Sequence, residues 1–121
     1  MKKTLVLKFT GKEMKYFDEL SNALGMPKGF MISQASKWLE MQLNSNKPYD
    51  LDLSDDSDKY TNPLMLRNIV IDESVQNILK QQAKKLGTTR YQLVRALIKK
   101  VPELLMTNQF YSMPINDLKY K

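Results

Sequence analysis

The side chains able to do chemistry in this chain are mainly cations, amides and hydroxyls. Its 121 residues include neither His nor Cys, which excludes imidazole bases, thiolate nucleophiles, disulfides and the usual zinc ligands. The Asp and Glu residues show no pairing typical of catalysis, so we expect no enzyme activity, no catalytic residue, no metal and no cofactor. Lys and Arg number 19 against 13 Asp and Glu, and the net charge of +6 favours a polyanionic partner.

Two short segments alternate in polarity and predict strands over residues 4–9 and 66–71. Their apolar faces carry Leu5, Leu7 and Phe9 in the first strand, and Ile69 and Ile71 in the second. Because side chains change face at every residue, the opposite faces must carry the alternate residues, which are Thr4, Val6, Lys8, Leu66, Asn68 and Val70. Several of these are aliphatic, which is unusual for a face that meets only solvent.

Each strand is followed by signals for two helices. Thr10 and Glu13 have the spacing of a capping box, Asp72 is a suitable N-cap, and Gly25 and Gly87 stand where left-handed C-caps are expected. Apolar residues at helical spacing predict the buried faces. These are Met14, Phe17, Leu20 and Leu24, then Met31, Ile32, Ala35, Trp38, Leu39 and Leu43, and, in the second half, Val75, Ile78, Leu79 and Leu86, then Leu93, Val94, Leu97, Ile98 and Val101.

The two halves share this pattern at a constant offset of 62 residues, which indicates an internal duplication. We divide the chain into a first unit (1–43), an acidic flexible linker (44–62), a second unit (63–106) and a C-terminal tail (107–121). The units carry net charges of +3 and +5 and the linker −3. The linker is rich in Asp, Ser and Asn and has little to bury. One unit cannot bury its own apolar faces, whereas two units can do so together.

The order of strand, helix, glycine and second helix opening at a cation resembles the ribbon-helix-helix superfamily of DNA-binding proteins, the group of the Arc, MetJ and CopG repressors. The first unit is similar to the CopG type through Leu5, Leu7, Gly25 and Lys28, and through the run Met31-Ile32-Ser33. The second unit resembles the general pattern through the runs at 72–75 and 87–90. The resemblance implies a mostly helical fold with a short two-stranded antiparallel β-ribbon, in which tandem ribbon-helix-helix units form an intramolecular pseudo-dimer.

The resemblance also implies that the outer face of the ribbon enters the major groove of double-stranded DNA and contacts bases. Asn68 suits adenine, Lys8 suits guanine, and Thr4 and Val6 suit thymine methyl groups, whereas Leu66 and Val70 offer apolar contacts alone. The starts of the second helices would clamp phosphates, since their free N–H groups attract anions. The expected phosphate contacts are Lys2, Lys3, Lys28, Gly29, Arg67, Arg90 and Tyr91.

Two of these expectations leave alternatives open. Arg67 stands among core positions of its strand, so we expect its side chain to escape to the ribbon edge, where it either grips a phosphate or pairs with a carboxylate of the fold. Thr89 and Gln92 have capping-box spacing, whereas Pro27 supplies no capping hydroxyl to the other helix start. The alternative for Lys28 and Arg90 is a solvated surface charge.

We expect a sequence-specific regulator of transcription, a repressor of plasmid or phage type. The alternative is a relaxosome or partition accessory, or an antitoxin-like protein, that binds another protein or a second copy of itself through residues 103–121. The aspartates at 50–58 lack the glycine and distal glutamate of a calcium loop and are expected to be solvated. No apolar run is long enough to span a membrane and the N-terminal one is too short for a signal peptide, so we expect a cytoplasmic protein.

Overall fold

A computed structural model describes residues 2–46, 48–54, 58 and 60–107, which fold as four helices and one two-stranded antiparallel sheet. The order strand, helix, helix occurs twice: β1 (Lys2–Thr10), α1 (Gly11–Leu24), α2 (Lys28–Ser45), β2 (Leu64–Asp72), α3 (Glu73–Leu86) and α4 (Arg90–Met106). Each element of the second half begins 62 residues after its counterpart. The predicted fold class, mostly helical with a short antiparallel ribbon, is confirmed.

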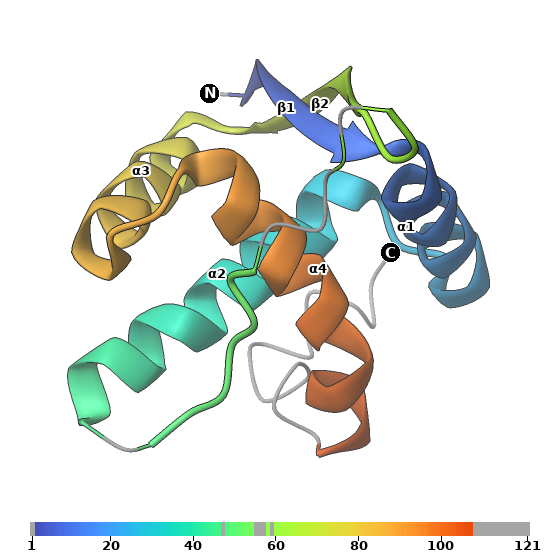
Figure 1. Ribbon diagram of the computed structural model, residues 1–121. Helices are drawn as coiled ribbons and strands as arrows, with labels where there is room; N and C mark the ends of the chain where they lie inside the picture. The colour runs from blue at the N-terminus through green and yellow to red at the C-terminus, as the bar shows by residue number, and fades with distance from the viewer. Residues whose placement is uncertain (1, 47, 55–57, 59, 108–121) are drawn as a thin grey trace.

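The ribbon lies along one side of the molecule, with α2 and α4 crossing beneath it and α1 and α3 toward its two ends (Figure 1). β1 and β2 pair over nine residues each, from Lys2 opposite Asp72 to Thr10 opposite Leu64. Val6 and Asn68, which are 62 residues apart, lie opposite each other at the middle of the ribbon. The strands begin two residues earlier and end one residue later than the alternation predicts.

The predicted helix boundaries match the caps that the structure contains. The Thr10 hydroxyl accepts a hydrogen bond from the Glu13 amide at 3.1 Å, and the Glu13 carboxylate accepts one from the Thr10 amide at 2.9 Å, which completes the capping box. The Asp72 carboxylate caps α3 through the Ser74 amide. α1 ends at Gly25 (φ 63°) and α3 at Gly87 (φ 67°), both in the left-handed conformation that glycine adopts without strain.

The core lies between the inner face of the ribbon and the helices. The five inward strand residues, Leu5, Leu7, Phe9, Ile69 and Ile71, are all buried. Beneath them pack the predicted apolar residues of α2 and α4, which are Met31, Ile32, Ala35, Trp38 and Leu39 and then Leu93, Val94, Leu97, Ile98 and Val101. Met14 and Phe17 of α1 and Val75 and Leu79 of α3 close the sides. Burial of apolar surface on this scale is the main force that holds the two halves together.

The segment between α2 and β2 has more to bury than its composition indicates, and that expectation is wrong at three positions. Tyr49, Leu51 and Leu53 pack against the core, and the Tyr49 ring meets Trp38 edge-on with 6.0 Å between the ring centroids. Closer to β2, the backbones of Asp58 and Asn62 exchange two hydrogen bonds of 2.9 Å. Alternate apolar residues at 49, 51 and 53 therefore attach this acidic segment to the helices.

The last helix continues past Pro102 and ends at Met106. Leu104 is fully buried and Leu105 packs on the core, so the start of the segment expected to contact another protein belongs to the core of this chain. The remainder of that expected contact, residues 108–121, lies outside the described residues. None of the helices in the described ranges is long and apolar enough to cross a membrane.

Gly29, in the first turn of α2, lies so close to β2 that a side chain does not fit. A β carbon there would stand 2.3 Å from the carbonyl oxygen of Val70, a backbone atom. Gly11 is also a glycine in the first turn of a helix, α1. A β carbon there would meet only the flexible end of the Met65 side chain, at 3.2 Å. The approach of α2 to the ribbon thus depends on glycine at position 29.

We predict that Gly29→Ala destabilises the fold by about 1–3 kcal/mol, because α2 must move away from the ribbon. This loss outweighs the gain of up to about 1 kcal/mol that Ala brings to a helix. Gly11→Ala, the control, is expected to be neutral or stabilising. Urea unfolding of the three proteins measures the difference, and equal stability of the two variants would show that the close approach is not required.

Candidate nucleic-acid interface

The six residues predicted to face away from the core lie together on one surface of the ribbon, which we call the outer face: Thr4, Val6, Lys8, Leu66, Asn68 and Val70. Five of them are exposed, including Leu66 at 65%, Val70 at 57% and Val6 at 42%. Their neighbours Leu5, Leu7, Ile69 and Ile71 are at most 5% exposed. The predicted strand faces are therefore confirmed, and the outer face has no covering element among the described residues.

Lys8 differs from the other five because it is only half-exposed. Its ammonium nitrogen lies 5.2 Å from the ring centroid of Tyr91, at the start of α4. A cation over an aromatic ring is attracted by the negative electrostatic potential of the ring face. Lys8 and Tyr91, which we expected to contact a base and a phosphate respectively, thus form one unit that connects the ribbon to α4.

Arg67 lies opposite Leu7, on the side of the strand that alternation assigns to core residues. Its side chain is nevertheless exposed. The predicted escape to the ribbon edge is confirmed. Of the two roles left open, pairing with a carboxylate finds no support, since Arg67 has no ion pair with any residue in the described part of the chain.

Lys2 and Lys3 lie at the end of the ribbon where β2 runs into α3. Lys2 is exposed opposite Asp72, and the Lys3 ammonium donates a 3.0 Å hydrogen bond to Glu73. Both members of this pair are about half exposed, and such surface pairs contribute little to stability. The pair can therefore open to an anion at small cost.

The start of α2 is a helix N-terminus without a side-chain cap. Pro27 occupies the cap position and makes no side-chain hydrogen bond to the first turn, as the sequence predicts. Lys28 is not a free cation, because its ammonium lies 2.7 Å from an Asp18 carboxylate oxygen and 5.9 Å from the Phe17 ring centroid. The positive potential of this helix start is therefore partly neutralised by Asp18.

The start of α4, unlike that of α2, has a side-chain cap. The Thr89 hydroxyl accepts the Gln92 amide at 3.2 Å, whereas the Gln92 carboxamide oxygen accepts the Thr88 hydroxyl and does not close onto Thr89. Only half of the predicted second capping box is present. Arg90 has no ion pair among the described residues, and its buried Nε has no acceptor there. The residue 62 positions after Asp18 is Lys80, which is exposed, so the sequence of the second half has a cation where that of the first half has an anion.

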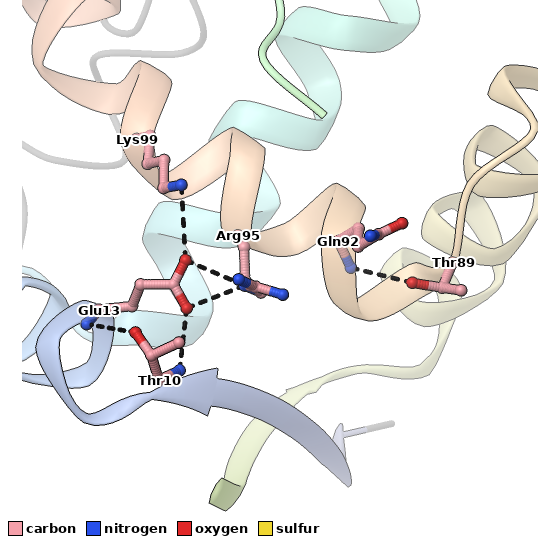
Figure 2. Close-up of polar contacts among 6 residues, drawn as sticks. All are labelled: Thr10, Glu13, Thr89, Gln92, Arg95 and Lys99. Carbon is pink, nitrogen blue, oxygen red and sulfur yellow. Dashed lines mark hydrogen bonds and ion pairs between the residues drawn. The ribbon is translucent and has the colours of Figure 1, made fainter. Parts of the chain in front are cut away.

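Glu13 has a larger role than the capping box that the sequence predicts. Besides its contact with Thr10, its carboxylate accepts hydrogen bonds from the Arg95 Nε at both oxygens, at 2.9 and 3.0 Å. One carboxylate oxygen also lies 3.5 Å from the Lys99 ammonium nitrogen (Figure 2). Burial raises the pKa of Glu13, but hydrogen bonds from the Thr10 amide and from Arg95, with the charge of Arg95, outweigh it and hold the pKa below its ordinary value of 4.5. The end of β1 is thereby tied to α4.

A second polar contact joins α2 to α3. The Gln82 carboxamide is fully buried, accepts a hydrogen bond from the Ser36 hydroxyl at 3.0 Å, and donates to the Ser36 carbonyl and to Glu40 at 3.0 and 3.1 Å. Neither this contact nor that of Glu13 with Arg95 is predicted by the sequence. Their partners are 82 and 46 residues apart, and no local pattern signals such pairs.

Comparison of the chain with family models, with curated proteins and with solved structures finds no match. The interpretation of the outer face therefore depends on the residues themselves and on their arrangement.

We predict that Glu13→Gln destabilises the protein by about 3 kcal/mol, since it leaves the buried Arg95 without its carboxylate. Gln still fits a capping box, so the loss reports the contacts of the carboxylate with Arg95 and Lys99 rather than the cap. Because the folded chain holds the pKa of Glu13 below 4.5, the stabilisation is present above that pH and disappears as the pH falls below it. Urea unfolding at several pH values from roughly 3 to 7, on both sides of that pKa, measures both effects.

Two controls define this result. Glu19→Gln removes an exposed charge from the same helix and is expected to change stability by less than about 0.5 kcal/mol. The double variant Glu13→Gln with Arg95→Met removes both charges and is expected to recover most of the loss. A stability of Glu13→Gln equal to that of Glu19→Gln would refute the central role of this contact.

Proposed function

We propose that this chain is a sequence-specific double-stranded DNA-binding protein of the ribbon-helix-helix type, whose two units pair within one chain and place their shared ribbon in the major groove. The observation that carries the proposal is the open outer face, where Asn68, Val6 and their neighbours stand together beside helix starts that carry Lys28 and Arg90. A two-stranded ribbon has the width to enter that groove and read base edges.

The arrangement of the two halves supports the pairing of two like units. The strands and the helix starts repeat at an offset of 62, and the register places residue 6 opposite residue 68, so the same offset relates the two central residues of the ribbon. Such a relation is what an approximate two-fold axis through the middle of the ribbon produces. In this proposal the axis meets the DNA between the two helix starts.

The charges support a polyanionic ligand. Lys2, Lys3 and Arg67 stand on the ribbon and Lys28 and Arg90 at the helix starts, around a face whose centre is uncharged. Phosphate contacts fix the position of a protein on a duplex, and base contacts at the centre select the sequence. Repression of transcription is the role that the family resemblance gives to such binding, and we include it in the proposal.

The test is selection of bound sequences from a random duplex pool, followed by titration of the selected duplex at several salt concentrations. With about four to six phosphates neutralised, log affinity is expected to fall against log salt with a slope of roughly −4 to −5. An unrelated duplex of the same length is the control and is expected to bind more weakly with a similar slope. A slope near zero, or a pool that yields no preferred sequence, would overturn the proposal.

The unequal helix starts give a second prediction. Arg90→Ala is expected to weaken binding to all duplexes alike and to reduce the salt slope by about 1, because it removes a cation that has no ion pair within the described residues. Lys28→Ala is expected to have a smaller effect, and Asp18→Asn to strengthen binding, since Asp18 holds the Lys28 ammonium at 2.7 Å.

The matched control for Asp18→Asn is Glu19→Gln, which makes the same change in net charge at the next position of α1. Equal gains in affinity from the two variants would mean that net charge alone is responsible. A gain confined to Asp18→Asn would show that release of Lys28 is the cause. Filter binding or fluorescence anisotropy at one fixed salt concentration compares the affinities of all four variants, and a salt titration of Arg90→Ala measures its slope.

A further inference from the structure

The outer face is built from two unequal rows of side chains. The row on β1 consists of Lys2, Thr4, Val6 and Lys8, with a cation at each end. The row on β2 consists of Leu64, Leu66, Asn68 and Val70, which are aliphatic apart from the single amide, and it ends at Asp72, opposite Lys2. The register sets Val70 opposite Thr4, Asn68 opposite Val6, and Leu66 opposite Lys8. Every one of these cross-strand pairs therefore contains both a methyl-bearing side chain and a group able to form hydrogen bonds.

The aliphatic side chains of this face are exposed to a degree that needs an explanation. Leu66 is 65% exposed, Val70 57%, Val6 42% and Leu64 37%, and they lie on adjacent strands. Scattered exposed aliphatic residues are common, but several of them gathered on one exposed face of a small protein often mark a binding site. Branched aliphatic side chains favour strand structure when they pack against a neighbour. A strand face that meets only water does not require such a row.

The charges beside this row limit the kind of partner. Lys2 and Arg67 lie on the same ribbon and Arg90 lies at the start of α4. No carboxylate is among the outward residues from Thr4 to Lys8 or from Leu64 to Val70, and Asp72, opposite Lys2, stands at the end of β2, where it caps α3. The fitting ligand is thus polyanionic at its edges and apolar at defined points in its centre. The major groove of DNA has this pattern, because phosphates line both edges and the C5 methyl group of thymine is its one apolar base substituent.

We infer that the β2 row recognises thymine methyl groups, so that the target is a duplex with thymines on both sides of a base pair read by Asn68. Val70 and Leu66 stand two residues to either side of Asn68 and contact the flanking methyl groups, while its carboxamide pairs with adenine. The two rows differ in chemistry, so the target is not a palindrome. This inference rests on the proposed DNA-binding function.

The experiment replaces the thymines of the selected duplex by deoxyuridine, one at a time and then together. Deoxyuridine lacks only the C5 methyl group and keeps the pairing and the phosphates, so electrostatic binding is unchanged. Each contacted methyl group is expected to contribute about fourfold in affinity, which is the effect of burying one apolar carbon. Replacement of two contacted thymines is therefore expected to weaken binding by more than tenfold.

Variants assign the methyl contacts to residues. Val70→Ala and Leu66→Ala are each expected to abolish the deoxyuridine effect at one thymine and to leave it at the other. Asn68→Ala is expected to relax the preference for adenine while both deoxyuridine effects persist. Met41→Ala removes a side chain that is 50% exposed on α2, away from the ribbon strands, and serves as the control with no expected effect on either quantity.

The outcomes separate this inference from the function on which it rests. A selected duplex that binds with a steep salt dependence but equally well with deoxyuridine would keep the proposed function and overturn the thymine contacts. A pool that yields no preferred duplex would overturn both and would assign the aliphatic row to contact with a protein. Loss of affinity with deoxyuridine that Val70→Ala and Leu66→Ala do not alter would also overturn the assignment to β2.

Discussion

The pairing of β1 with β2 is the interaction on which the rest of the structure depends. Each strand finds its only sheet partner, within the described residues, in the other half of the chain. The inner face of that ribbon supplies Leu5, Leu7, Phe9, Ile69 and Ile71 to one shared core, so neither half can bury its helices alone. The same pairing creates the outer face, because alternation turns the neighbours of Leu5, Leu7, Ile69 and Ile71 to the opposite side of the ribbon.

Two buried polar contacts favour the pairing of unlike halves. The positions 62 residues from Glu13 and Arg95 are Val75 and Ser33, and those 62 residues from Ser36 and Gln82 are Ile98 and Leu20. If the second half paired with the second half of another copy, Arg95 would face Val75 of that copy in place of Glu13, and the Gln82 carboxamide would face its Ile98 in place of Ser36. Burying an unmatched guanidinium or amide costs several kcal/mol, roughly enough to exclude such pairings.

The sequence predicts those features that local physics determines. Alternation located both strand faces, Thr10 with Glu13 located the start of α1, and the two left-handed glycines located the helix ends. The sequence could not predict contacts between residues far apart in the chain, such as Arg95 with Glu13 or Lys8 with Tyr91. These contacts depend on how the helices cross. The composition of the linker predicted that it has little to bury. Three apolar residues among many polar ones, Tyr49, Leu51 and Leu53, are enough to pack the segment against the core.

The differences between the halves lie where a duplicated DNA-binding unit gains from them. A symmetric dimer of identical chains must present each side chain twice and cannot distinguish the two directions along a duplex. Here the paired strands differ on the outer face, and the helix starts differ in charge, with Asp18 beside Lys28 and Lys80 at the corresponding position of the second half. Under the proposed function, the strand difference selects the bases and the charge difference strengthens the grip on one side. A single chain of this kind would bind an asymmetric site in one orientation.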